Sequence, residues 1–272
     1  MSRRRINGFD LYYERQGDGE AVVLVHGSWT DHVSWTFVVD DLAQTNHVVT
    51  YDRRGHSRSE RGAAAVPRRV DENDLVALIE SLGLGPVHLV GNSYGASISL
   101  GVAARRPDLV RTVTAHEPPL IGIATPGSAL ATELGPVVGA LETVAAAVGR
   151  GNAEAAAEQF VEEVALGPGS WQLLPLENRQ TMVANAPMII DVVDDPHSSE
   201  PPRLAEIAAP VLLTDGAASP AWLPAIVEAL AATADVARYT FAVAGHVPHL
   251  THPAEHVAVA RSFIESTSPV TA

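Results

Sequence analysis

The feature that most constrains the fold is the stretch 86–97, where an apolar run, a Gly91-x-Ser93-x-Gly95 motif and a helical run follow one another directly. The run Val87–Val90 is typical of a buried strand, and the residues from Ser97 to Arg106 favour a helix. A strand that turns sharply into a helix needs small residues on both sides of the turn, because a side chain there would collide with the neighbouring strand or with the helix. The residue at the tip then occupies a strained backbone position. We therefore predict that Ser93 presents its hydroxyl above a sheet.

Apolar runs alternate with helical patterns on both sides of this stretch. Strands are expected at 21–25, 48–51, 87–90, 110–114, 211–214 and 236–243, with an antiparallel edge strand at 9–15. Helices are expected at 34–43, 67–82, 97–106, 221–232 and 253–266. Such alternation predicts the α/β class with a doubly wound, mostly parallel sheet, in which ligands bind at the carboxyl ends of the strands.

The alternation stops between residues 120 and 202. No strand pattern occurs there, and helical stretches are expected near 129–148, 152–166, 171–185 and 186–194. We predict one core domain formed by 1–119 and 203–272, with 120–202 inserted as a helical unit.

Composition narrows the classes of partner. A net charge of -14 disfavours nucleic acid and anionic membrane surfaces as partners. The chain has no cysteine, which excludes disulfides, thiolate metal sites and a cysteine nucleophile. The basic start is not followed by an apolar segment of a secretory signal, and no apolar run is expected to reach membrane-spanning length. We expect a cytoplasmic protein that acts on a small molecule, without metal or cofactor.

A serine needs a base to become a good nucleophile. His246 directly follows the last expected strand, and Gly245 lets the loop bend so that the imidazole reaches back over the sheet. His249 and His252 are alternatives that lie further into the next helix.

An oxyanion needs two preset N–H donors. One is the backbone amide of Tyr94, at the start of the helix after Ser93. The other is expected in the loop after the strand 21–25, from Ser28, with Trp29 as second choice. His26 in the same loop is expected to form local hydrogen bonds only.

Four motifs, HGSW, YDRRGHSRS, GNSYGA and AGHVPHLTHP, resemble those of the α/β-hydrolase superfamily in this order and at these spacings. The resemblance covers nearly the whole chain and implies that 120–202 is the cap that lies over the nucleophile. The second motif departs from the usual pattern because His56 stands where a glycine is common. We interpret that segment as structural, with Arg54 anchoring loops.

The resemblance also implies an acid that orients the histidine, usually an aspartate after the next-to-last strand. Ser219 stands at that position. Glu117 follows the strand next to that of the nucleophile, where some members of the superfamily place their acid, and we predict that it completes the triad. Asp215 is the rival, and Asp52 is a weaker one.

The expected activity is that of a serine hydrolase that cleaves a carboxylic ester or lactone through an acyl-enzyme. Carbon–carbon bond hydrolysis and cofactor-free perhydrolysis with the same triad are alternatives, and a non-enzymatic ligand-binding receptor is an alternative of another class. A serine nucleophile excludes the aspartate-dependent relatives. A medium-sized, mainly apolar substrate is expected to contact Trp29, Tyr94, Trp171, Met182, Met188, Trp222 and Val247.

Overall fold

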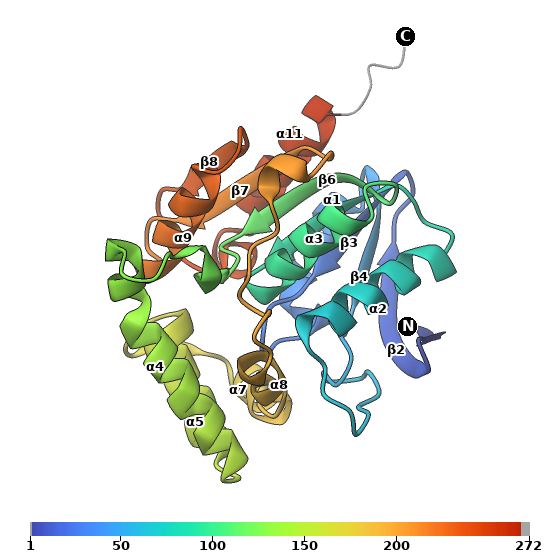
Figure 1. Ribbon diagram of the computed structural model, residues 1–272. Coiled ribbons are helices and arrows are strands. Elements are labelled where there is room, and N and C mark those ends of the chain that lie inside the picture. The colour runs from blue at the N-terminus through green and yellow to red at the C-terminus, as the bar shows by residue number, and fades with distance from the viewer. Residues whose placement is uncertain (1, 268–272) are drawn as a thin grey trace.

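The computed structural model describes residues 2–267 and holds one eight-stranded sheet (Figure 1). The strand order is β1-β2-β4-β3-β5-β6-β7-β8. The strands are β1 (Ser2–Ile6), β2 (Phe9–Gln16), β3 (Glu20–Val25), β4 (Asn46–Tyr51), β5 (Val87–Asn92), β6 (Val110–His116), β7 (Val211–Gly216) and β8 (Ala237–Phe241).

The pairing confirms a doubly wound, mostly parallel sheet. All neighbours from β4 to β8 in the sheet order are parallel, whereas β1 and β2 pair antiparallel to each other and β2 pairs antiparallel to β4. The expectation that 9–15 forms the edge was wrong, because β1 covers that edge of β2. The basic run that forms β1 is exposed except at Ile6, so its sequence lacks the apolar alternation of a half-buried strand.

Helices cover both faces of the sheet and form two separate cores. Alternate residues of β3 point to opposite faces, so Val23 and Val25 join one apolar cluster while Val22 and Leu24 join the other. The first cluster includes α2 (Arg68–Ser81), α3 (Tyr94–Arg105) and α9 (Trp222–Ala231). The second includes η1 (His32–Trp35), α1 (Thr36–Leu42) and α11 (Pro253–Thr267). A short helix, α10 (Pro248–Thr251), precedes α11.

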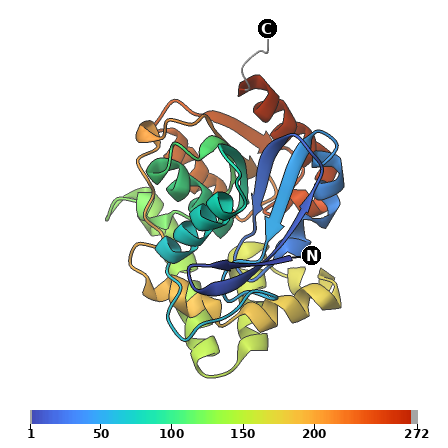
Figure 2. The same ribbon diagram turned by 90° about the vertical axis from the view of Figure 1, so that its right-hand side faces the viewer.

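Between β6 and β7 the chain is described throughout and forms helices and turns, with no strand. The turn η2 (Ile121–Ile123) comes first, and η4 (Leu204–Glu206) leads back to β7. The helices are α4 (Ala129–Gly149), α5 (Ala153–Gln159), the π-helical turn η3 (Phe160–Ala165), α6 (Ser170–Leu173), α7 (Leu176–Asn185) and α8 (Met188–Asp194). Figures 1 and 2 show α4 to α8 gathered in one layer at one end of the sheet. We call residues 120–202 the cap.

The expected helix 171–185 is divided in the structure. Leu174 and Pro175 are extended, and α6 ends before them while α7 begins after them. A proline disfavours helical backbone in the residue that precedes it, which explains the break.

Helix α4 departs from the expectation that no apolar segment reaches membrane-spanning length. It has 21 residues and is long and apolar enough to span a membrane by length and composition alone, and 28% of its most apolar window is buried. In the structure α4 packs against α5, α8 and η3 within the cap.

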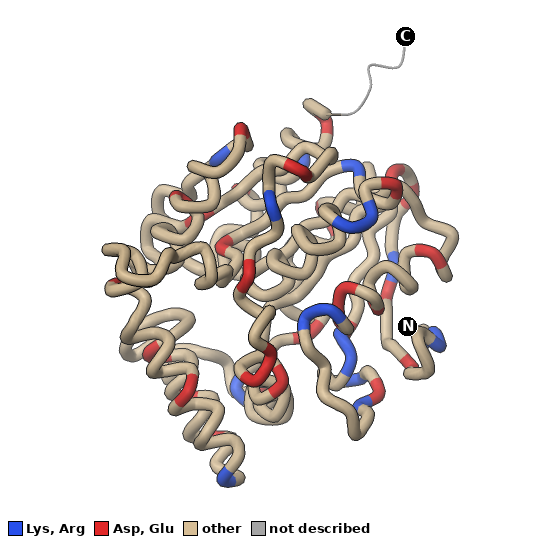
Figure 3. The backbone as a smooth tube through the Cα atoms, viewed as in Figure 1, with Lys and Arg blue, Asp and Glu red and all other residues tan. Residues whose placement is uncertain are grey.

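Acidic and basic residues are scattered over the outer elements (Figure 3). Helix α2 nevertheless buries two carboxylates that pair with the loop after β4: Arg53 lies 2.7 Å from Asp71, and Arg54 donates two hydrogen bonds to Asp74. This confirms that Arg54 anchors the loop. The apolar period of the helix expected at 67–82 predicts an inner face of Val70, Leu75, Leu78, Ile79 and Leu82. Leu75, Leu78 and Ile79 are buried and the other two are half-buried, but the period gives no signal for buried acids.

Candidate active site

Ser93 lies at the strained turn between β5 and α3. Its φ of 54° and ψ of -125° are unfavourable for a residue with a side chain. A Cβ on Gly95 would lie 2.1 Å from the carbonyl oxygen of Val25, and one on Gly91 would lie 2.6 Å from that of Gly95. The predicted reason for both glycines, collision with the neighbouring strand and with the helix, is therefore confirmed.

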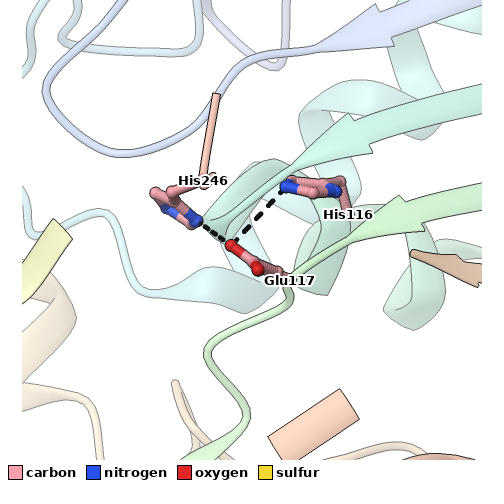
Figure 4. A group of neighbouring side chains, drawn as sticks. All are labelled: His116, Glu117 and His246. Atoms are coloured by element: carbon pink, nitrogen blue, oxygen red, sulfur yellow. Dashed lines mark hydrogen bonds and ion pairs between the residues drawn. The ribbon is translucent and has the colours of Figure 1, made fainter. Parts of the chain in front are cut away.

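His246 and Glu117 meet beside this turn (Figure 4). Nδ1 of His246 lies 2.6 Å from Oε2 of Glu117, and both side chains are buried. Asn92 adds a hydrogen bond of 2.8 Å from its Nδ2 to the backbone oxygen of His246. Ser93 and His246 line the same two cavities, and no hydrogen bond joins them in the described chain. Long catalytic hydrogen bonds are common in free enzymes.

Glu117 is fixed from several sides. It directly follows β6 with a positive φ of 44°, and its side chain is 0% exposed. The backbone N–H of Gly216, at the end of β7, donates to Oε1 over 2.8 Å. Since Oε2 is left for His246, the carboxylate holds one imidazole nitrogen while the other stays available.

His116 is a second histidine at this carboxylate, and sequence reasoning missed it. Its Nε2 lies 3.5 Å from Oε2 of Glu117 and has no hydrogen-bond partner among the described residues, while Nδ1 lies 2.9 Å from Oγ1 of Thr214. Burial holds the pKa of His116 well below its usual value, and the nearby His246 adds to this effect. Because the imidazole of His116 is neutral, it adds no positive charge that would compete with His246 for the carboxylate of Glu117. The sequence signal that could have indicated His116 is its position at the end of β6, directly before Glu117.

The rival acids have other partners. Asp215 pairs with Arg238 at 2.8 Å. Asp52 accepts two hydrogen bonds from His32, one from its backbone N–H and one from Nδ1. It accepts a third from the backbone N–H of Arg58. The hydroxyl of Ser219 is buried and has no hydrogen-bond partner in the described chain.

The two predicted oxyanion donors, Ser28 and Tyr94, line the same cavity as Ser93. Tyr94 begins α3, so its N–H lies at the positive end of the helix dipole. Ser28 follows Gly27, where a Cβ would lie 3.1 Å from Cβ of Ser93. Neither backbone N–H donates to another described residue. Trp29, the second choice, has a φ of 68° and stacks on Phe160 with ring centroids 4.7 Å apart.

The other histidines considered do not reach Glu117. His249 is buried against Trp35, with ring centroids 4.4 Å apart, and burial holds its pKa well below the usual value. His252 lies 3.0 Å from the hydroxyl of Thr251. Nδ1 of His26 lies 2.9 Å from the backbone oxygen of Gly27, as the local role predicts. Its Nε2 accepts from the backbone N–H of Arg53 in the loop after β4, a contact outside the predicted local role.

Two groups of side chains have the spacing of metal ligands. One consists of His116, Glu117 and His246, and the other of Asp31, His32 and Asp52. In the first group the carboxylate already binds His246 and the amide of Gly216. In the second both oxygens of Asp52 accept hydrogen bonds, as do those of Asp31. Hydrogen bonds thus hold the carboxylates of both groups, whereas Nε2 of His116 has no hydrogen-bond partner among the described residues.

Two cavities, of about 210 and 310 Å³, share Ser28, Ser93, Phe160, Ala165 and His246 as common wall. Of the residues predicted to contact substrate, Tyr94 and Trp222 line the smaller cavity, and Met182 and Val247 line the larger.

The remaining predictions for the pocket are corrected. Trp29 and Met188 line a separate void of about 10 Å³ behind Ser28. Trp171 lies in a groove on the cap that contains neither Ser93 nor His246. Aromatic residues of a cap can serve its own core, and Trp171 is buried there.

Comparisons with known proteins agree with this geometry. The model of the alpha/beta hydrolase family matches residues 22–259. The uncharacterized hydrolase YraK of Bacillus subtilis is 35% identical over 119 residues, which cover 43% of this chain and 44% of that protein. The matched part is thus less than half of that relative. An alpha/beta hydrolase structure from Sphaerobacter thermophilus is 26% identical, with a TM-score of 0.75 over 97% of this chain and 100% of that one. An enol-lactonase from Burkholderia xenovorans, 20% identical, has the same fold, with a TM-score of 0.80 over 97% of this chain and 100% of that one.

Proposed function

The chain belongs to the alpha/beta hydrolase family, and from that premise we propose that it is a serine hydrolase that cleaves a carboxylic ester or lactone. The observation that carries the proposal is the buried contact of 2.6 Å between His246 and Glu117, at a cavity that Ser93 also lines. A histidine oriented by a carboxylate beside a strained serine is the arrangement that nucleophilic acyl transfer requires.

In the first half of the reaction, Nε2 of His246 takes the proton of Ser93 while Oγ attacks the substrate carbonyl carbon. Glu117 keeps the other nitrogen protonated and stabilises the positive charge that develops on the ring. The carbonyl oxygen becomes an oxyanion and accepts hydrogen bonds from the backbone N–H groups of Ser28 and Tyr94. When the tetrahedral intermediate collapses, His246 gives its proton to the leaving alcohol, and the acyl group stays on Ser93.

The second half repeats these steps with water. His246 takes a proton from water, which attacks the acyl-enzyme, and the second intermediate releases the acid while the proton returns to Ser93. The sum is ester and water to acid and alcohol, so the cycle needs no further reactant. Burial of Glu117 and the hydrogen bond from Gly216 keep the carboxylate in place through both halves.

The test is hydrolysis of p-nitrophenyl esters by two purified serine variants. Ser93→Ala removes the attacking atom, so kcat/KM should fall by at least about 10³-fold with the fold intact by circular dichroism. Ser28→Ala is the matched control, since it shortens a side chain in the same cavity and keeps the backbone N–H; it should stay within about tenfold of the wild type, because loss of the N–H itself costs 10²–10³.

Turnover by Ser93→Ala close to that of the wild type would contradict the proposal. A wild-type enzyme that cleaves β-diketones but no ester would keep Ser93 as nucleophile and assign carbon–carbon bond hydrolysis instead. Ligand binding without turnover of either class would assign a receptor.

A further inference from the structure

The two cavities that meet at Ser93 differ in chemistry. We call the smaller one the apolar chamber and the larger one the polar chamber. Beyond the common wall, the apolar chamber is lined mainly by hydrocarbon, including Ile121, Leu141, Val164 and Trp222, and its polar lining residues include Glu142, Ser198 and Ser199. Its volume is about 210 Å³, smaller than the 310 Å³ of the other cavity. The apolar chamber therefore fits a short hydrocarbon chain.

Most of the surface of the polar chamber is also apolar, but one wall, which α7 supplies, has hydrogen-bonding groups. Asn178, Thr181, Met182 and Asn185 recur at helical spacing and thus lie on one face of α7. Asn185 fixes this face to the core, because its amide donates to the backbone oxygens of Trp29 and Thr30 and its oxygen accepts from Ser57.

Asn178 and Thr181 line the polar chamber and are half-buried. Within residues 2–267 neither side chain forms a hydrogen bond, so both have donors and acceptors available for a ligand.

The loop of His246 decides which part of a substrate enters which chamber. The leaving oxygen takes its proton from His246 and must therefore lie beside that ring. Val247 and Leu250, which follow His246 in the chain, line only the polar chamber, whereas Tyr94 of the oxyanion site lines only the apolar one. The leaving group thus departs toward the polar chamber, and the acyl chain occupies the apolar chamber.

Charges at the polar chamber disfavour an anionic leaving group. Asp31 and Glu177 contribute two carboxylates to its wall. Arg58 also lines the chamber, but its guanidinium lies over the ring of Tyr12 and donates to the hydroxyl of Tyr12. A neutral, hydroxylated alcohol matches the free groups of Asn178 and Thr181 without burying a like charge.

The common wall is rigid at Phe160. The ring comes from the π-helical turn η3, is largely buried, and stacks on Trp29 with an interplanar angle of 16°. Two spaces that meet at the nucleophile suit an acyclic ester, whose two halves extend in different directions from the carbonyl carbon. In a small lactone both halves close into one ring, so they do not extend into two separate chambers.

We propose that the substrates are acyclic esters of a short apolar acid with a neutral hydroxylated alcohol. This inference rests on the proposed serine hydrolase activity. Asn178 and Thr181 then bind the alcohol, and Leu141 limits the length of the acyl chain.

The experiment compares two esters with exchanged halves, 1-glyceryl hexanoate and hexyl glycerate, by titration of released acid with the full chain. The first should have a kcat/KM about tenfold or more above the second, because only it places the hydroxyl groups at α7, at a factor of roughly 2–10 for each hydrogen bond. Preference for hexyl glycerate, or equal rates, would overturn the assignment of the chambers.

Variants test each chamber separately. Asn178→Leu and Thr181→Val should each lower kcat/KM for 1-glyceryl hexanoate about 2- to 10-fold through KM and leave methyl hexanoate unchanged. Gln180→Leu, on the exposed face of the same helix, is the control. Leu141→Trp should shift the preferred methyl ester from six or more acyl carbons to about four or fewer by filling the chamber, whereas Leu173→Trp, at a position 84% exposed, should not.

The two levels of the account fail differently. If no ester is cleaved, or Ser93→Ala remains active, the serine hydrolase activity itself is wrong. If esters are cleaved in a Ser93-dependent way and the α7 variants affect methyl hexanoate and 1-glyceryl hexanoate equally, the activity stands and the chamber assignment is overturned.

Discussion

At the scale of single residues, the carboxylate of Glu117 organises the site. Its two oxygens have separate tasks: Oε1 accepts from Gly216 of β7, and Oε2 holds His246. The side chain thereby links the ends of β6 and β7 to the loop after β8. Glutamate at the end of β6 supplies the charge that Ser219, at the more usual position, lacks.

Glu117→Gln should therefore lower kcat for ester hydrolysis by about 10³- to 10⁴-fold, because a neutral amide neither fixes the tautomer of His246 nor stabilises its charge. The matched control is Asp215→Asn, which removes the partner of Arg238 and leaves Glu117 in place. Its kcat should stay within about tenfold of the wild type, because the buried Asp215 pairs with Arg238 whereas the partner of His246 is Glu117. The reverse ranking of the two variants would refute the role of Glu117.

Residues at strand ends were predictable, because parallel strands bring their carboxyl ends to one edge. This rule indicated Ser93, His246 and Glu117 from the sequence, and the structure brings them to one region. It could not indicate that Asn92 holds the loop of His246, since the acceptor is a backbone oxygen, which every residue has. Trp171 was misplaced because apolar character does not distinguish the core of the cap from the substrate cavity.

At the scale of elements, the turn from β5 into α3 depends on the absence of two side chains. Gly95→Ala places a methyl group 2.1 Å from the backbone oxygen of Val25, and backbone cannot move as a flexible side chain does. We expect a loss of about 2 kcal/mol or more of unfolding free energy, together with loss of activity, as for other overpacked core positions.

Gly135→Ala is the control within the same chain. Gly135 lies in α4 with no atom within 4 Å of the added methyl group among the described residues, so alanine should stabilise that helix by up to about 1 kcal/mol. Chemical denaturation measures both variants. Equal stability of the two would show that the close approach of α3 to β3 is not required.

Elements were predicted better than their packing. The apolar period predicted α2 and its buried leucines. Three acids of the same helix, Asp71, Glu72 and Asp74, are also buried. Arginines of the loop after β4 and of α3 pair with these carboxylates. Such pairs combine residues from different elements, so no local pattern reveals them. Pro175 marks the break between α6 and α7 in the sequence, although the helical period continues across it.

At the scale of the whole molecule, buried histidines should set the acid limit of stability. Burial lowers the pKa of six of them: His26, His56, His88, His116, His249 and His256, the last to about 4. The unfolded chain therefore binds these protons first as the pH falls below about 6.5. Each such histidine lowers the unfolding free energy by up to about 1.4 kcal/mol per pH unit until its native pKa is reached.

Two groups act in the opposite direction. Burial raises the pKa of Asp71 to about 6, so the native state takes up that proton first as the pH falls from 6 toward 3.8. Burial opposes protonation of His32, but the Asp52 carboxylate at its Nδ1 raises the pKa of His32 above the ordinary value. Because six groups oppose two, the unfolding free energy should decrease from pH 7.5 to pH 5.

Urea denaturation at pH 7.5, 6 and 5 measures this dependence. His256→Leu removes one of the six groups at a buried position and should give a shallower decrease over the same range. Stability that stays constant or rises toward pH 5 would contradict the assignment of these histidines as neutral in the folded state.

The central claim is that Ser93 is a nucleophile activated by His246 and Glu117. Its most direct test is reaction of the intact protein with a fluorophosphonate ester, followed by intact mass and peptide mapping. The account predicts one adduct per chain, located on Ser93, absent in Ser93→Ala and formed at least about 10³-fold more slowly in Glu117→Gln. An adduct on another residue, or one that persists in Ser93→Ala, would contradict it.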